Sequence, residues 1–142
     1  MAGRAAFGTT IAFGSDTPTT VANVTSISGL DGSTEMIDVT SHDSGGAYRE
    51  KIASFLDAGT VSVELNFDPN TVTHRATTGG ILYLRDQRTK TTWTITFPGS
   101  PSHKVAFDGY VKSAGFSAPF DDKLGMTVEI EVSGQPTWTY GT

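Results

Sequence analysis

The stretch TKTTWTITFPGS, residues 89–100, alternates apolar and polar side chains with a period of two. In an extended chain, Trp93, Ile95 and Phe97 point to one side and the intervening threonines to the other. Pro98-Gly99 then ends the run. The stretch therefore predicts a strand with one buried and one solvated face.

The same alternation occurs in two other stretches, at Val61–Phe67 and Thr127–Ser133. The segment HKVAFDGYVKSAGF, residues 103–116, continues the pattern between them, and the tail QPTWTYGT is expected to dock on the domain. With 142 residues and one buried face for each strand, the chain predicts a single, mainly β domain. We expect an antiparallel sheet or sandwich with one helix.

The helix is expected within residues 70–88, with Asp68 as N-cap and Pro69 in its first turn. Gly79 and Gly80 weaken this helix without excluding it. Upstream, the turn signal Asp31-Gly32 predicts a hairpin between strands at residues 20–28 and 35–40.

Two segments carry apolar residues that belong to none of the expected strands. The first is an N-terminal arm, residues 1–19, with Phe7, Ile11 and Phe13. The second is a long loop, residues 41–59, whose large apolar residues are Tyr48, Ile52, Phe55 and Leu56. Such residues often anchor interfaces, but the loop residues are also at helical spacing, so a short helix packed on its own domain is an equal alternative.

The composition excludes several classes of protein. The net charge of −5 disfavours a surface that binds nucleic acid. The absence of cysteine excludes disulfides and thiolate metal sites. The sequence shows neither a signal-peptide pattern nor an apolar run long enough to cross a membrane, which predicts a soluble chain without membrane binding.

The run Ser41-His42-Asp43-Ser44 contains the residue types of a catalytic triad. Neighbours in an extended chain point to opposite faces, however, so adjacency argues against a triad. The three histidines lack the spacing of a zinc site, and no phosphate-binding glycine motif occurs. We predict no catalytic residue, no metal and no cofactor.

The order of segments along the whole chain resembles the tail tube (major tail) proteins of phages with long, non-contractile tails. The most specific parts are EMIDVTSHDSGGAYREKIASFLDAGTVSVELNFDP, residues 35–69, and FDGYVKSAGFSAPFDDKLGMTVEIEVSG, residues 107–134. The resemblance implies a β-sandwich or partly open barrel with one flanking helix. It also implies hexameric rings stacked into a channel for DNA and the tape-measure protein, and further partners in the tail-tip and tail-terminator proteins. The chain would then reside in the virion, after assembly in the host cytoplasm.

Glu64, Glu129 and Glu131 are the predicted lumen residues, because carboxylates on a solvated strand face repel the phosphates of passing double-stranded DNA without binding it. The opposite assignment, to the outer wall, is equally open at this point. The predicted contacts with neighbouring subunits come from the arm and the loop: Phe7, Ile11, Phe13, His42, Asp43, Tyr48, Arg49, Glu50, Lys51, Ile52, Phe55 and Leu56.

Three alternatives stand beside the tube subunit. One is a tail-completion, connector or secretion-system tube protein that forms a single ring. Another is a ligand-binding β-sandwich that uses Trp93, Trp138, Tyr83 or Tyr110 as stacking platforms. An enzyme using His42 or the acidic pairs is the weakest of the three.

Overall fold

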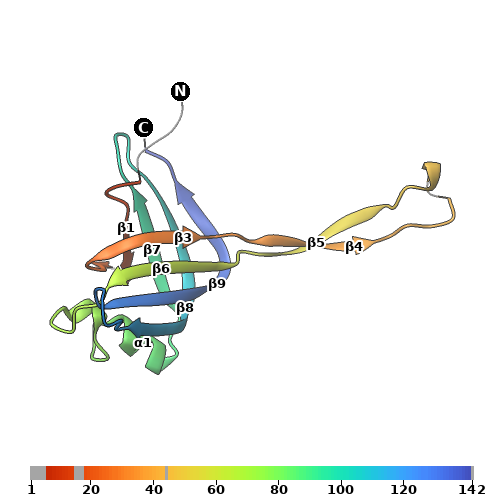
Figure 1. Ribbon diagram of the computed structural model, residues 1–142. Coiled ribbons are helices and arrows are strands. Elements are labelled where there is room, and N and C mark those ends of the chain that lie inside the picture. The colour runs from red at the N-terminus through yellow and green to blue at the C-terminus, as the bar shows by residue number, and fades with distance from the viewer. Residues whose placement is uncertain (1–5, 15–17, 44, 142) are drawn as a thin grey trace.

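The computed structural model describes residues 6–14, 18–43 and 45–141. Figure 1 shows a body of curled β-sheet from which one long hairpin projects. The strands are β1 (Thr10–Phe13), β2 (Thr19–Thr20), β3 (Val24–Gly29), β4 (Ser33–Asp38), β5 (Lys51–Asp57), β6 (Thr60–Asn66), β7 (Thr91–Phe97), β8 (His103–Ser117) and β9 (Gly125–Thr139). The helical segments are α1 (Ile81–Gln87) and two 3-10 turns, η1 (Gly45–Ala47) and η2 (Val72–His74).

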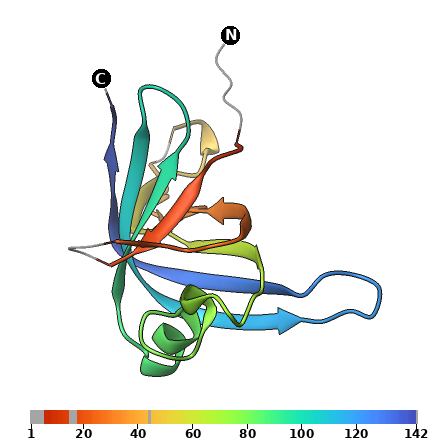
Figure 2. The ribbon, with the colours of Figure 1, turned by 90° about the vertical axis from the view of Figure 1, so that its left-hand side faces the viewer.

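The body is one antiparallel sheet of seven strands in the order β2-β1-β7-β8-β9-β6-β3. Strands β8 and β9, each 15 residues long, are shared by both halves of the sheet. Their register shifts at Ala106/Asp108 and at Val111/Ser113. Such bulges bend a strand and increase its twist, and Figure 2 shows both long strands bending between the two halves of the sheet. The predicted sandwich or partly open barrel is confirmed as this half-barrel.

The predicted strands at 61–67, 92–97 and 127–133 are confirmed as β6, β7 and part of β9. Their alternating apolar residues form the core on the concave side of the sheet, where Val61, Trp93 and Ile130 are at most 1% exposed. This alternation decided the fold because a period of two places every second side chain on one face. No helix in the part of the chain that the structure describes is long and apolar enough to cross a membrane.

The predicted hairpin around Asp31-Gly32 is wrong. Strand β3 pairs with β6, whereas β4 pairs with β5 in a separate two-stranded sheet. Gly32 instead lies where the chain leaves the body, and its Cα approaches the backbone of Asp57 and Ala58 so closely that a Cβ would collide with it.

The predicted helix over 70–88 is also too long. Residues 72–74 form only a 3-10 turn, and α1 begins at Ile81 with Gly80 as its N-cap. A Cβ on Gly80 would collide with the backbone of Arg75, so the chain breaks here to pack one segment on the other. Asp68 does not cap α1; its carboxylate accepts hydrogen bonds from the backbone N–H of Asn70 (3.0 Å) and the hydroxyl of Thr71 (3.4 Å).

Candidate functional site

The β4–β5 hairpin projects from the body and has no buried residue in either strand (Figure 1). Its large apolar side chains face solvent: Phe55 is 81% exposed, Leu56 80% and Tyr48 78%. Because residues 51–57 form a strand, the alternative of a short helix packed on its own domain is wrong. The segment 41–59, predicted as a loop, is the end of the hairpin followed by its second strand.

Apolar side chains occupy both faces of this hairpin. Met36 lies opposite Ala53 and Ile37 opposite Ile52, so Met36 and Ile37, as neighbours in one strand, point to opposite faces. Leu56 is paired with Thr34 and shares the Met36 face, because the extra residue of the register shift lies in β5. Met36, Ile37 and Ile52 are 43 to 53% exposed. A two-stranded ribbon of this kind has no core of its own.

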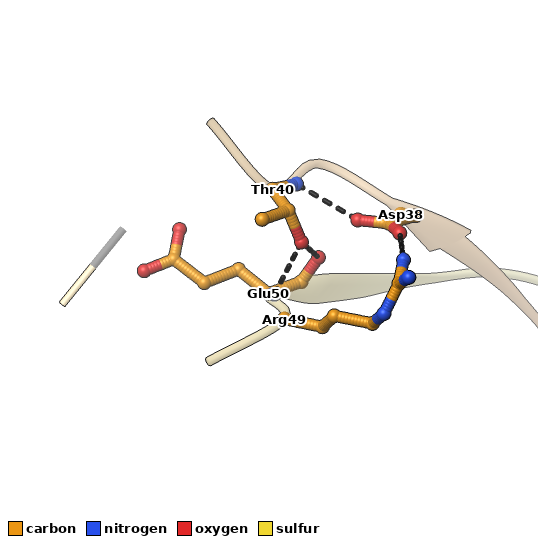
Figure 3. A network of polar contacts seen from close by, with 4 residues as sticks. All are labelled: Asp38, Thr40, Arg49 and Glu50. Carbon is orange, nitrogen blue, oxygen red and sulfur yellow. Dashed lines mark hydrogen bonds and ion pairs between the residues drawn. The ribbon is translucent and has the colours of Figure 1, made fainter. Parts of the chain in front are cut away.

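A polar network stiffens the outer end of the hairpin (Figure 3). Asp38 accepts a hydrogen bond from the backbone N–H of Thr40 at 2.9 Å and pairs with the Arg49 guanidinium at 2.9 Å. The Thr40 hydroxyl accepts the Glu50 N–H at 2.7 Å and bonds to the Glu50 carbonyl oxygen at 3.3 Å. The hydrogen bonds from Thr40 and then the nearby Arg49 and Lys51 cations lower the pKa of the Asp38 carboxyl from its ordinary 3.8.

At its base the hairpin is tied to β6. Asp31 Oδ1 accepts the Thr60 N–H at 3.3 Å, and Asp57 Oδ1 accepts the Gly59 N–H at 2.9 Å. The first bond links the base of the hairpin to the start of β6, and the second stabilises the turn between β5 and β6.

The polar residues predicted to line a lumen share the convex face of β3, β6, β9 and the second half of β8. Register places Ser28, Ser62, Glu129 and Ser113 in one row across the four strands. Glu129 accepts a hydrogen bond from Ser113 at 3.3 Å. Glu64 lies in the neighbouring row on β6, so the structure brings the predicted carboxylates onto one surface.

Glu131 lies in the row on the other side of the Ser62–Glu129 row, and two partners contact it. The Thr60 hydroxyl donates to it at 3.1 Å, and the Lys112 ammonium group approaches it at 3.8 Å. The Lys112 and Glu131 side chains are 58% and 46% exposed, so this ion pair is weak. The surface is therefore acidic, with the Lys112 cation beside one of its carboxylates.

The four strands that carry this polar face have two edges for neighbours to cover. One is β3, which pairs with β6. The other is β8 beyond residue 109, because β7 pairs only with residues 103–109. Arg85 of α1 covers part of this second edge by donating to the Ala114 carbonyl oxygen at 2.7 Å. Such edges pair with other strands unless they are covered.

The N-terminal residues predicted as interface anchors divide into two groups. Ile11 and Phe13 lie in β1 at 1% and 7% exposure, and Phe13 packs on Trp93 with ring centroids 5.5 Å apart. Their prediction as contacts with a neighbour is corrected, because both are buried in this chain's own core. Phe7 is 94% exposed and remains available. Residues 1–5 and 15–17 of the predicted arm lie outside the described residues.

Phe7 lines an apolar groove of about 1080 Å³ between β3 and the ends of β7 and β9. Ile27, Phe97, Trp138 and Tyr140 also line it, and the last three form a parallel stack with centroid separations of 6.1 and 6.3 Å. Trp138 and Tyr140 are 47% and 69% exposed. Trp93, offered above as a stacking platform, is core instead.

Sequence reasoning missed a second apolar surface, at the β8–β9 connection. Phe116 is 70% exposed and stacks on Phe67 with centroids 6.3 Å apart, and Phe120 is fully exposed. The signal was present in SAPFDD, residues 117–122, where a phenylalanine stands among turn residues with no strand face to join.

The residues considered for chemistry do not converge. His42 and Asp43 lie exposed at the end of the projecting hairpin, whereas His74 is fully buried in the body. The Nδ1 of His74 accepts the Asp68 N–H at 3.1 Å, and its Nε2 donates to the Ala22 carbonyl oxygen at 2.7 Å. Over residues 6–14, 18–43 and 45–141, no group of three or more histidine or carboxylate side chains could hold a metal.

A known protein family matches most of the chain, and several solved structures share its fold. Residues 9–139 match the family described as lambda phage tail tube protein, TTP. No curated protein sequence matches the chain. The fold is similar to a chain of the virion of a native gene transfer agent (GTA) particle, with a TM-score of 0.76, 14% identity, and 96% of this chain and 99% of that one covered.

Two further solved structures share the fold. A chain in the tail of an empty GTA particle, refined helically with C6 symmetry, has a TM-score of 0.73 at 17% identity, covering 92% of this chain and 94% of its own. A chain of the sheath/tube terminator of an extracellular contractile injection system (PVC) has a TM-score of 0.72 at 11% identity, covering 98% of each chain.

Proposed function

The chain belongs to the lambda phage tail tube protein family and is a tail tube subunit, and we propose that it assembles there into stacked rings of six copies. The number six is supported by the C6 symmetry of the structurally similar GTA tail. In this role the chain is a structural component and not an enzyme.

The projecting hairpin is the observation that carries the proposal. A ribbon with no buried face, with several large apolar side chains about half or more exposed, gains stability only when another surface covers it. We assign the hairpin to contacts with neighbouring subunits, with Tyr48, Ile52, Phe55 and Leu56 as apolar anchors. His42, Asp43, Arg49, Glu50 and Lys51 lie at its outer end and provide the polar contacts around them.

The acidic convex face is the proposed wall of the channel. In a ring, the open β3 and β8 edges of this face would meet neighbouring copies, so that the Ser62, Glu64 and Glu129 surface closes around a lumen. Carboxylates there repel DNA phosphates and keep the duplex from adhering. The concave side is filled by the core and cannot serve as the wall.

The partners follow from this assignment. The lumen would hold the tape-measure protein and pass double-stranded DNA without specific binding, and the ends of the tube would meet tail-tip and terminator proteins. The chain would assemble in the host cytoplasm and reside in the virion.

Electron microscopy and sedimentation of the purified, concentrated protein test the proposal. We expect rings and tubes; a protein that stays monomeric across salt, pH and concentration would refute it. Rings that never stack would favour a single-ring terminator, a role for which the likeness to the PVC terminator chain gives a specific reason.

A further inference from the structure

Each of the two faces of the projecting hairpin carries its own pair of exposed apolar side chains. Met36 and Leu56 occupy one face, and Ile37 and Ile52 occupy the other. None of the four packs on the body of its own chain, because all are more than 40% exposed. A single flat contact would cover one face and leave the other pair in water.

We infer that each hairpin is held between two different neighbouring copies of this chain, one on each face. The inference rests on the proposed self-assembly. It adds that one subunit contacts two others through this element alone, which links three chains and not two. A head-to-tail contact of this kind continues from ring to ring and produces a tube rather than a closed pair.

The body provides two apolar surfaces that suit the two faces. One is the groove lined by Phe7, Phe97 and Trp138, and the other is the Phe116 and Phe120 surface at the β8–β9 connection. They lie at opposite ends of the 15-residue strand β8, because His103 lines the groove and Phe116 is next to the last residue of the strand. Because the two surfaces lie at opposite ends of one body, we assign the two faces of one ribbon to two different copies.

Charge also separates the two faces. Asp38 lies opposite Lys51 on the Met36 face, near the outer end of the hairpin, and also forms an ion pair with Arg49. Glu35 and Asp57 lie on the Ile37 face, so one face presents a carboxylate between two cations and the other presents two carboxylates. Two different partner surfaces can complement the different charges of the two faces.

Photo-cross-linking counts the neighbours directly. Benzoylphenylalanine replaces Met36 and Ile52 in the same chain, and this doubly labelled chain is mixed at low fraction into unlabelled protein before assembly and irradiation. We expect covalent products of three chains, one labelled and two unlabelled. Chains labelled at only one of the two positions are the control and should stop at two. Products limited to two chains from the doubly labelled protein would overturn the inference.

Single-face substitutions provide the second measurement. Met36→Ser with Leu56→Ser, and separately Ile37→Ser with Ile52→Ser, change only exposed side chains and should leave the monomer folded. Each pair is expected to raise the concentration needed for tube formation at least about tenfold. If one pair has no effect, one face is free and the inference fails. If the unsubstituted protein forms no tubes at all, the proposed function fails first.

Discussion

At the scale of the residue, Asp38 organises the end of the hairpin. Hydrogen bonds from Thr40, followed by the charges of Arg49 and Lys51, lower its pKa below 3.8. A lowered pKa in the folded chain means that the carboxylate stabilises the tip at pH values above 3.8. This stabilisation is lost as the pH falls through the lowered value.

Both the hydroxyl and the N–H of Thr40 lower the pKa of Asp38, and the hydroxyl is the largest cause. We therefore predict that Thr40→Val, which removes the hydroxyl but keeps the N–H, raises the Asp38 pKa towards its ordinary value more than Arg49→Gln does. An NMR titration of the Asp38 carboxyl carbon in the monomer measures both. A larger rise with Arg49→Gln would show that the ion pair dominates.

His74 shows the same dependence of local order on hydrogen bonds, but in the core of the body. His74→Phe keeps a ring stacked on Phe67, whose centroid lies 6.0 Å away, yet leaves the Asp68 N–H and the Ala22 carbonyl oxygen without their partner. We expect a loss of about 2 to 6 kcal/mol in unfolding free energy, since two groups lose their partner and each orphaned group costs roughly 1 to 3 kcal/mol. Denaturant unfolding of the monomer measures it. His42→Phe, at an exposed position, is the control and should change stability by less than about 0.5 kcal/mol; equal effects would contradict this role of His74.

At the scale of the element, the hairpin is separable from the body. Its base brings Gly32 beside Asp57 and Ala58, so residues 33–57 can be replaced by a two-glycine link. Because the excised strands bury no residue, we expect the unfolding free energy to change by less than about 1 kcal/mol and tube formation to be lost. Circular dichroism with denaturant unfolding checks the fold, and sedimentation checks assembly. If the chain without the hairpin still forms tubes, the hairpin is not needed for assembly.

The strands could be predicted from sequence and the hairpin partners could not, for a physical reason. Alternation in Thr91–Phe97 reports burial of one face, which is local information. The Asp31-Gly32 signal is also local, but here long-range pairing of β3 with β6 outweighed it. Gly79-Gly80 weakened the predicted helix in the sequence, yet only the close approach of Gly80 to Arg75 shows that they break it.

The candidate surfaces were predictable to a similar degree. Loop residues such as Tyr48 and Phe55 were recognised because no strand needed them, but Met36 was missed. The adjacent apolar pairs Met36-Ile37 and Phe55-Leu56 carry the signal: neighbours in a strand point to opposite faces, so such pairs indicate a ribbon apolar on both sides. Ile11 and Phe13 were misassigned because four residues of alternation are too short to distinguish a sheet strand from an arm.

At the scale of the whole molecule, the chain combines a body that is stable by its own core with a ribbon that is not. The core lies on the concave side of the half-barrel and the carboxylates on the convex side, so ring closure would place charge and hydrophobic surface in separate layers. The direction in which the polar face points therefore decides which side chains line the channel.

A cryo-EM reconstruction of tubes grown from the purified chain determines this direction. We predict six subunits per ring, with Glu64, Glu129 and Glu131 lining the channel and the β4–β5 hairpin between neighbouring copies. A map that places these three carboxylates on the outer wall, or the hairpin free in solvent, would contradict it.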